Sequence, residues 1–209
     1  MFKFIVLGYK GLRFIIHLCM NAINFLSNDI PIKYNVLKTI KGRLFLSVKG
    51  KLVIGKNVRI NSRFSANPIG GQSFTSIVVK KNCVLSIKDN VAISNSSIFC
   101  SDRITIMEDV FIGGDCKIYD TDFHSLILEN RILDNDPDIK TSPVVIEKGA
   151  FIGTHTIILK GVTVGEESIV GAGSIVTKNI PPREIWAGNP AKFIRKLNDT
   201  IKASHSDEI

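Results

Sequence analysis

An aliphatic side chain recurs at every sixth position in the later part of the sequence. Ile or Val occupies six successive positions of this series: 146, 152, 158, 164, 170 and 176. A period of six matches neither the 3.6-residue turn of an α-helix nor the two-residue alternation of a strand. It fits short strands joined by corners, three to each turn of a triangular coil, with the aliphatic side chains stacked inside from turn to turn. The period therefore predicts a parallel β-helix.

The same spacing extends toward the N-terminus in Ile106, Ile112 and Ile118, in Ile87, Ile93 and Phe99, and in Ile54 and Ile60. Ile, Leu and Val fill 62 of the 209 positions, while aromatic residues make up 8%, and this favours β-branched stacking over a helical bundle. The expected fold class is mainly β. We assign residues 51–181 to the β-helix, residues 1–50 to an amphipathic helix and its lead-in, and residues 182–209 to a C-terminal helix and tail.

Two segments interrupt the repeat. Residues 61–78 are rich in Gly, Ser and Asn and are out of phase, and residues 119–143 form a polar, acidic excursion between two in-phase blocks. A long loop on a rigid repeat usually carries function. After the last coil, Asn189-Pro190 is expected to begin a helix with one apolar face, made of Phe193, Ile194, Leu197 and Ile201.

The first sixty residues combine positive charge with an amphipathic pattern. They hold eleven Lys or Arg residues and one acidic residue, Asp29. The longest charge-free run of this region, Phe14–Asn28, has fifteen residues, fewer than the ~20 that span a bilayer. The apolar residues of this region fall on one helical stripe: Leu12, Ile15, Ile16, Cys19, Met20, Ile23 and Leu26. Two interpretations remain open: the helix covers an end of the domain, or it rests on an anionic membrane surface, helped by Lys3, Lys10 and Arg13.

The sequence also limits the other partners and the compartment. No zinc-finger spacing, RNP-like aromatic motif or helix-turn-helix signature accompanies the positive charge, so we expect no nucleic-acid binding. The four cysteines, Cys19, Cys83, Cys100 and Cys116, form no CxxC pair. Free thiols in a reducing compartment are the simplest interpretation, and they predict a cytoplasmic protein.

Three segments carry more than the bare repeat: ITIMEDVFIGGDCKIYDTDFHS (104–125), AFIGTHTIILKGVTVGEESIVGAGSIVTKNIPP (150–182) and AGNPAKFIRKL (187–197). Together they resemble the hexapeptide-repeat acyltransferases, in the branch of maltose, galactoside and capsular-polysaccharide O-acetyltransferases. The resemblance implies a left-handed β-helix, a homotrimer and acetyl-CoA as co-substrate. It also implies acetyl transfer to a sugar hydroxyl, in capsule, O-antigen or exopolysaccharide synthesis. Phe151 departs from the pattern, because a Trp is common at this position in the branch.

His124 is the only histidine of the excursion, and an imidazole titrates near neutral pH. The resemblance implies that His124 is the general base that takes the proton of the acceptor hydroxyl. Asp122 is the candidate carboxylate that orients the imidazole, with Asp120 or a backbone carbonyl as alternatives. Asp120 and Asn95, the latter from an SNSS turn, are the candidate acceptor-binding residues.

The matching positions of the motif also assign the coenzyme. Thr154, Ala172, Thr177 and Lys178 are implied to line the path of the pantetheine arm between two subunits, with Arg195 at a phosphate. Phe151 is implied to take the packing role of the missing Trp. For Lys178 and Arg195, a solvated basic surface remains the alternative.

Two alternative functions have different chemical requirements. An N-acetyltransferase acting on an amino sugar needs the same base as an O-acetyltransferase. A γ-type carbonic anhydrase instead needs three histidines around a metal at a trimer interface. The histidines here are His17, His124, His155 and His205; they form no close pair, and two lie outside the coils. The sequence therefore predicts no metal site.

Overall fold

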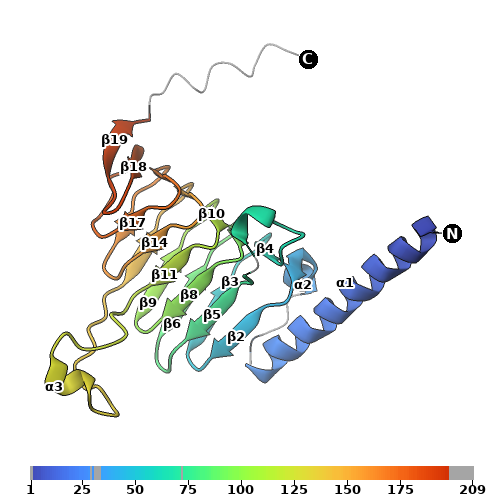
Figure 1. Cartoon of the computed structure of the whole chain (residues 1–209), viewed down its shortest axis with the longest axis horizontal. Helices are drawn as coiled ribbons and strands as arrows, with labels where there is room; N and C mark the ends of the chain where they lie inside the picture. Colours follow the sequence, from blue (N-terminus) through green and yellow to red (C-terminus); the bar gives the residue numbers. More distant parts are fainter. Residues whose placement is uncertain (1, 29, 31–33, 72, 198–209) are drawn as a thin grey trace.

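The computed structural model describes residues 2–28, 30, 34–71 and 73–197, whose strands form a three-sided prism (Figure 1). Successive strands of the chain join the three sides in turn, so that three strands make one coil and each strand pairs in parallel with strands of the coils above and below. The fold is a left-handed parallel β-helix, as predicted. Its first coil begins at Ile40, earlier than the predicted boundary at residue 51.

We number the sides in the order in which the chain meets them. Sheet 1 contains β1 (Ile40–Gly42), β4 (Arg59–Ser62), β7 (Ala92–Ser94), β10 (Phe111–Gly114), β13 (Phe151–Ile152), β16 (Ile169–Val170), β18 (Glu184–Ala187) and β19 (Lys192–Lys196). Sheet 2 contains β2 (Phe45–Val48), β5 (Ser76–Val79), β8 (Ser97–Cys100), β11 (Lys117–Tyr119), β14 (Ile157–Ile158) and β17 (Ile175–Val176). Sheet 3 contains β3 (Lys51–Ile54), β6 (Val84–Ile87), β9 (Arg103–Ile106), β12 (Val144–Ile146) and β15 (Thr163–Val164).

Stacked aliphatic side chains fill the prism. In sheet 1, Ile112, Ile152 and Val170 are register partners from coil to coil, and all three are buried. Every position of the series from 146 to 176 is likewise buried, which confirms the period-six prediction. Because each coil covers the apolar side of its neighbour, the prism needs no other core.

One member of the predicted series is out of phase. The corner between Ile93 and the next inward residue is one residue shorter than the repeat, so Ile98 takes the buried position and pairs with Ile118. Phe99 therefore faces outward and is not a core residue. The error comes from extending a strict period across the SNSS turn.

The C-terminal helix is also a wrong prediction. Residues 192–196 form strand β19, which pairs antiparallel with β18. Gly188, with a φ of 103°, reverses the chain, and β18 offers β19 a free edge because its other edge pairs with β16. Phe193 and Ile194 are exposed on this strand rather than lying on a helical face. Ile201 lies outside the described residues.

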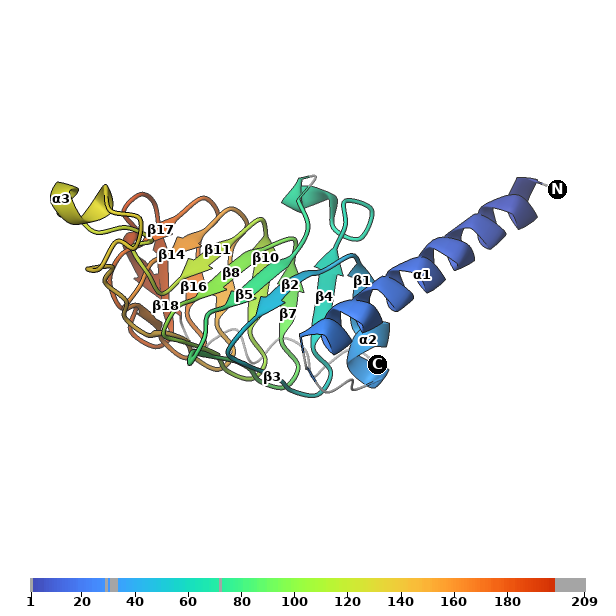
Figure 2. The same ribbon diagram turned by 90° about the horizontal axis from the view of Figure 1, so that it is seen from below.

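The C-terminal turns of helix α1 (Phe2–Ser27) lie at the N-terminal end of the prism, beside the short helix α2 (Tyr34–Thr39), and the rest of α1 projects away from the coils (Figure 2). Phe25 is buried in the core. The Asn21 side chain is buried as well: its Nδ2 donates to the Gly42 carbonyl at 2.9 Å, and its Oδ1 accepts from the Leu44 N–H at 3.0 Å. The helix therefore covers an end of the domain, which was one of the two interpretations left open.

A second apolar face of α1 has no partner among the described residues. Its side chains are between 46% and 64% exposed: Leu12, Ile15, Ile16, Ile23 and Leu26. No described helix combines the length and the apolar character needed to cross a bilayer.

The excursion leaves the prism after Tyr119 and returns at Val144, as the sequence predicted. It carries α3 (Leu128–Arg131) at its tip and projects away from the coils (Figures 1 and 2). A bridge between Thr121 and Thr141 closes its base. The other interruption forms a loop with one turn of 3₁₀ helix, η1 (Pro68–Gly70), on the opposite border of sheet 2.

Candidate active site

His124 lies just beyond the base of the excursion. Its Nδ1 is 3.1 Å from Oδ2 of Asp136, and its side chain is 68% exposed against 9% for Asp136. Both carboxylate oxygens of Asp136 also accept from the Ser125 N–H, at 3.1 and 3.0 Å. The loop thus fixes a carboxylate that holds one nitrogen of an open imidazole, leaving Nε2 available to a bound molecule.

Aromatic packing fixes the chain immediately before His124. The Phe123 ring lies 4.8 Å from the Phe99 ring and 5.0 Å from the Tyr119 ring, measured between centroids. Phe123 has a φ of 64°, and its N–H donates to the Thr121 hydroxyl at 3.2 Å. The phase slip that turns Phe99 outward therefore supplies the surface on which the histidine-bearing loop rests.

Asp120 is a buried anchor of the prism. It is fully buried, and its two oxygens accept from the N–H groups of Ser101 and Asp102 at 2.6 and 2.9 Å. Burial raises the pKa of the Asp120 carboxyl, although those two backbone donors oppose the shift. This carboxyl binds the corner of the preceding coil, so the structure gives no support to the predicted contact with an acceptor.

Asp122 does not contact the His124 imidazole, its predicted partner. Its Oδ2 lies 3.4 Å from Nζ of Lys160, at the corner after β14. The contact that the sequence analysis assigned to Asp122 is made by Asp136, twelve residues after His124. The sequence does not show which of Asp134, Asp136 and Asp138 contacts the His124 imidazole. A loop has no repeating pattern, so the spacing of these residues does not predict which carboxylate lies next to His124.

The predicted coenzyme residues divide between two borders of sheet 2. Thr154 and Ala172 lie where the chain passes from sheet 1 to sheet 2, which we call the 1–2 edge, and the Thr154 hydroxyl donates to the Gly114 carbonyl at 2.6 Å. Thr177 and Lys178 follow β17 on the 2–3 edge, from which the excursion also leaves. Arg195 is exposed on β19. One chain therefore does not bring His124 together with Thr154 and Ala172.

Asn95 lies on the 1–2 edge beneath the loop of residues 63–75. It is 1% exposed, and its Nδ2 donates to the Asn67 carbonyl at 3.1 Å. Its Oδ1 is buried without a hydrogen-bond partner among the described atoms. An acceptor cannot reach the Asn95 side chain in this arrangement, because η1 packs over it. The contact is so close that a Cβ on Gly70 would lie 2.6 Å from Asn95 Nδ2.

Metal-ligating side chains do not gather anywhere in the part of the chain that the structure describes: no group of three His, Cys, Asp or Glu residues is placed to hold an ion. His155 is exposed and lies 3.2 Å from Asp115, between Nδ1 and Oδ2. It forms a second histidine–carboxylate pair, on the 1–2 edge next to Thr154.

Comparison of the sequence with known proteins identifies the repeat and its relatives. Residues 143–178 match the model of the hexapeptide repeat of succinyl-transferase. A Staphylococcus aureus (strain COL) protein provisionally named an acetyltransferase is 42% identical over 86 residues, which are 41% of this chain and 42% of that protein. Galactoside O-acetyltransferase from Escherichia coli (strain K12) is 50% identical over 60 residues, 29% of this chain and 30% of that protein. The similarity thus spans less than half the length of these relatives.

Comparison with solved structures covers more of the chain. A hexapeptide-repeat acetyltransferase from Vibrio cholerae, solved in complex with acetyl coenzyme A, is 27% identical with a TM-score of 0.56. The match covers 70% of this chain and 71% of that one. The likeness therefore includes most of the prism as well as the repeat.

Proposed function

We propose that this chain, a member of the hexapeptide-repeat acetyltransferase family, transfers an acetyl group from acetyl-CoA to a sugar hydroxyl, with His124 as the general base. The observation that carries the proposal is the open imidazole held by a buried carboxylate on a loop that projects from the prism. The relatives named as acetyltransferases, and the one solved with acetyl coenzyme A, support the choice of donor. Surface polysaccharide synthesis is the proposed setting.

The chemistry follows from the histidine pair. With the Nδ1 proton donated to Asp136, the His124 Nε2 lone pair accepts the proton of the acceptor hydroxyl. The hydroxyl oxygen attacks the thioester carbonyl, and the resulting tetrahedral oxyanion collapses with loss of the coenzyme A thiolate. That thiolate takes the proton back from the imidazolium, whose charge the Asp136 carboxylate has stabilised. The acetyl group passes directly to the acceptor, with no acyl-enzyme.

Acetyl transfer to sugars can be tested by measuring the free thiol released from acetyl-CoA and by identifying the acetylated product. The purified protein is incubated with acetyl-CoA and a panel of free, nucleotide-linked and lipid-linked sugars, and the products are identified by mass spectrometry. An acetyl ester on a sugar supports the proposal. Acetylation confined to amino groups would replace it with the N-acetyltransferase alternative, and the absence of any acetylated product would reject both.

A homotrimer brings the two groups of residues together. His124, Thr177 and Lys178 belong to the 2–3 edge, and Thr154 and Ala172 belong to the 1–2 edge. Placing the 2–3 edge of one copy against the 1–2 edge of the next completes the site, and three copies close the ring. The exposed apolar side chains of the excursion give the contact a driving force, among them Leu126 at 82% and Ile132 at 72% exposure.

We therefore expect a particle of about 69 kDa, three times the chain mass of 23.1 kDa. Light scattering measures this directly, and Leu126→Asp should shift the mass toward the monomer and abolish acetyl transfer with it. Asp134→Ala is the control within the same loop, since it changes an exposed charge without removing apolar surface. A wild-type monomer with full activity would contradict the shared site.

The unpartnered face of α1 is proposed to rest on an anionic membrane surface on the cytoplasmic side. Two observations favour lipid: the apolar side chains of this face are about half exposed, and the first sixty residues have a large excess of Lys and Arg. An apolar stripe next to positive charge binds anionic interfaces by insertion and by attraction together.

Cys19 reports on this contact. It is the exposed cysteine of the described chain, whereas Cys83, Cys100 and Cys116 are buried. Burial raises the pKa of Cys100 to about 12 and that of Cys116 to about 11, so both remain unreactive thiols at neutral pH. Phosphatidylglycerol vesicles should slow maleimide labelling of Cys19 at least ten-fold at low salt, and phosphatidylcholine vesicles should not.

High salt should restore most of the labelling rate, because the attraction is screened. Ile23→Asp should abolish the protection, while Ile194→Asp at the other end of the prism should preserve it. Labelling that is unchanged by anionic vesicles would contradict membrane binding. Protection that depends on protein concentration instead of lipid would assign the face to a second copy of the chain.

A further inference from the structure

The outer face of sheet 1 carries a groove of about 520 Å³ that the proposed chemistry does not use. It runs across β1, β4, β7, β10 and β13, a span of about 19 Å at the usual strand spacing. Small residues make the hollow, since Ala92 and Gly113 lie between larger side chains of the flanking strands. The volume lies within the range of small-molecule sites.

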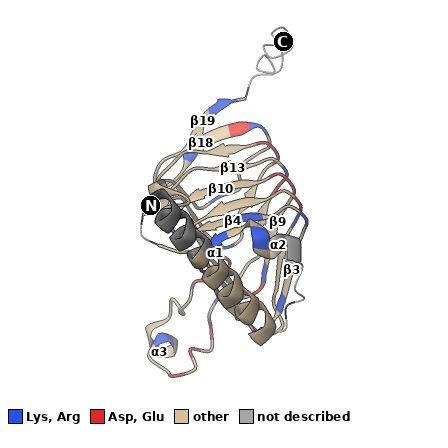
Figure 3. Cartoon of the chain, turned by 90° about the vertical axis from the view of Figure 1, so that its right-hand side faces the viewer, with Lys and Arg blue, Asp and Glu red and all other residues tan. Residues whose placement is uncertain are grey.

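One end of the groove is strongly cationic. Lys41 on β1 and Arg59 on β4 are exposed there, and Lys38 of α2 lines the same end (Figure 3). Among the described residues that line the groove, none is acidic. The Arg59 guanidinium lies 5.8 Å from the centroid of the Phe111 ring, which holds it over the groove while its N–H groups remain free to bind oxygen. Lys41 and Arg59 face no acidic residue of the described groove lining, and two such cations select a multiply charged anion.

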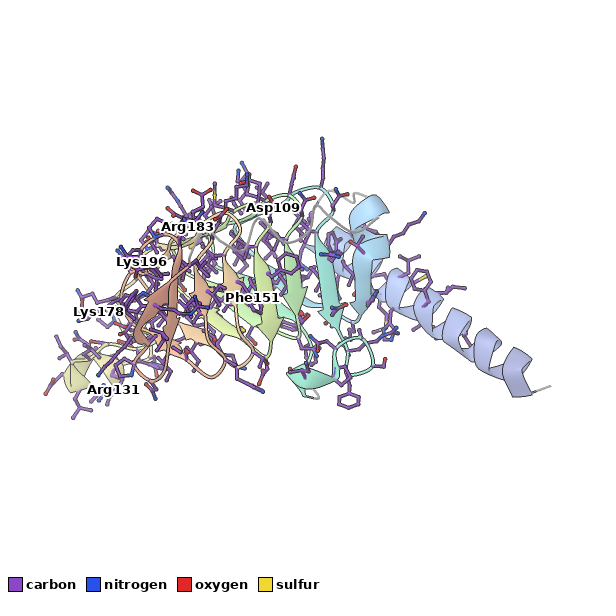
Figure 4. The ribbon with its side chains drawn as sticks, turned by 90° about the horizontal axis from the view of Figure 1, so that it is seen from above. Asp109, Arg131, Phe151, Lys178, Arg183 and Lys196 are labelled. Atoms are coloured by element: carbon purple, nitrogen blue, oxygen red, sulfur yellow. The ribbon has the colours of Figure 1, made fainter. Side chains whose placement is uncertain are left out.

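The other end is aromatic. Phe111 and Phe151 are register partners on neighbouring strands, and each ring is 47% exposed. Phe151 lies on this prism face, apart from Arg131 of the excursion (Figure 4). Between the two ends lie an amide and a hydroxyl, with Asn61 Nδ2 donating to Ser94 Oγ at 3.2 Å. From β1 to β13, the groove thus presents positive charge, then hydrogen-bonding groups, then flat aromatic rings.

We propose that this groove binds the acceptor as a glycosyl diphosphate, with the diphosphate on Arg59 and Lys41 and the sugar ring against Phe111 and Phe151. The inference rests on the proposed function and specifies its substrate class. Phe111 and Phe151 begin β10 and β13, so the rings stand about two residues, roughly 7 Å along the strand, from the 1–2 edge, where a Cβ on Gly113 would meet the Thr154 backbone nitrogen at 2.6 Å. A sugar on the rings therefore lies near the coenzyme path proposed at Thr154 and Ala172, with its phosphates directed away from it.

Calorimetry with inorganic pyrophosphate tests the cationic end without reference to activity. Saturating coenzyme A is present throughout, so that the coenzyme's own phosphate site is filled. We expect Arg59→Ala and Lys41→Ala each to weaken pyrophosphate binding at least ten-fold. Arg103→Ala, which removes an exposed cation from sheet 3, should leave it unchanged. Equal binding by all four proteins, or no binding by the wild type, would overturn the proposal.

The rate of acetyl transfer then shows whether the acceptor sugar is linked to a nucleotide or to a lipid. The three acceptors are a uridine diphosphate sugar, the same sugar on farnesyl diphosphate, and its methyl glycoside. We expect one or both diphosphates to be the better substrates, with Arg59→Ala raising their KM at least ten-fold and changing kcat and the KM for acetyl-CoA little. Preference for the farnesyl compound identifies a lipid-linked acceptor, and preference for the uridine compound a nucleotide-linked one.

The two proposals fail differently. Efficient acetylation of the methyl glycoside, with Arg59→Ala behaving as the wild type, would overturn the diphosphate site and leave the acetyltransferase intact. Groove-dependent pyrophosphate binding without transfer to any acceptor would reject the acetyltransferase and leave the anion site standing.

Discussion

Replacing His124 by alanine should lower the turnover number for acetyl transfer about 100- to 10,000-fold, the usual contribution of a positioned general base. The loss corresponds to roughly 3–5 kcal/mol of activation free energy. The affinity for acetyl-CoA should change little, because the proposed coenzyme contacts lie on β-helix corners rather than on the excursion. Steady-state kinetics together with coenzyme binding by calorimetry separate the two quantities.

His155→Ala is the matched control. His155 is also exposed and also pairs through Nδ1 with a carboxylate, 3.2 Å away on Asp115. Its loss should change the turnover number less than about three-fold, because His155 takes no proton in the proposed mechanism. As the neighbour of Thr154 on the 1–2 edge, it should instead affect the KM for acetyl-CoA. Near-normal turnover in His124→Ala would reject the mechanism, and loss of the trimer in that variant would make His124 a structural residue instead.

Replacing Asp136 by asparagine should lower turnover by roughly 100-fold or more, because the amide reverses the tautomer of His124. The amide nitrogen of asparagine donates to Nδ1, so the imidazole proton moves to Nε2. A protonated Nε2 no longer accepts the proton of the acceptor hydroxyl. The KM for acetyl-CoA should stay near its wild-type value, which distinguishes a positioning defect from a general loss of structure.

Asp122→Asn is the control for this second prediction. It removes another carboxylate of the excursion, two residues before His124, that contacts Lys160 instead of the imidazole. Its effect on turnover should remain below about five-fold. If Asp122→Asn were the more damaging change, the original assignment from sequence would be correct and the Asp136 contact would have only a structural role.

The repeat can be recognised in the sequence because equivalent positions of every coil have the same buried surroundings and therefore carry the same type of residue. Ile112, Ile152 and Val170 stack on one another, so their spacing records the length of the coil. Phe99 was misplaced because one shortened corner shifts the phase of the strand that follows it. The C-terminal strand was missed for a different reason: an edge left open by β18 decided the conformation of residues 192–196.

The candidate site was predictable only in part, because its residues obey no period. His124 stands out as the single histidine of the excursion, whereas its partner is defined by how the loop folds back on Ser125. Asp120 looked like a member of the site, yet its neighbours in space are backbone N–H groups of the preceding coil. Chemistry-bearing residues in a loop are visible from sequence, but their pairing depends on tertiary structure.

The asparagines of α1 have a consequence for solubility. Asn21, Asn24 and Asn28 hydrogen-bond to the backbone of residues 42–48, where another coil would otherwise attach. A stack of identical rungs has no inherent last rung, and an open rung can accept the end of another molecule. By occupying those backbone groups with side-chain amides, the helix terminates the ladder. We expect this cap to hinder end-to-end growth into filaments.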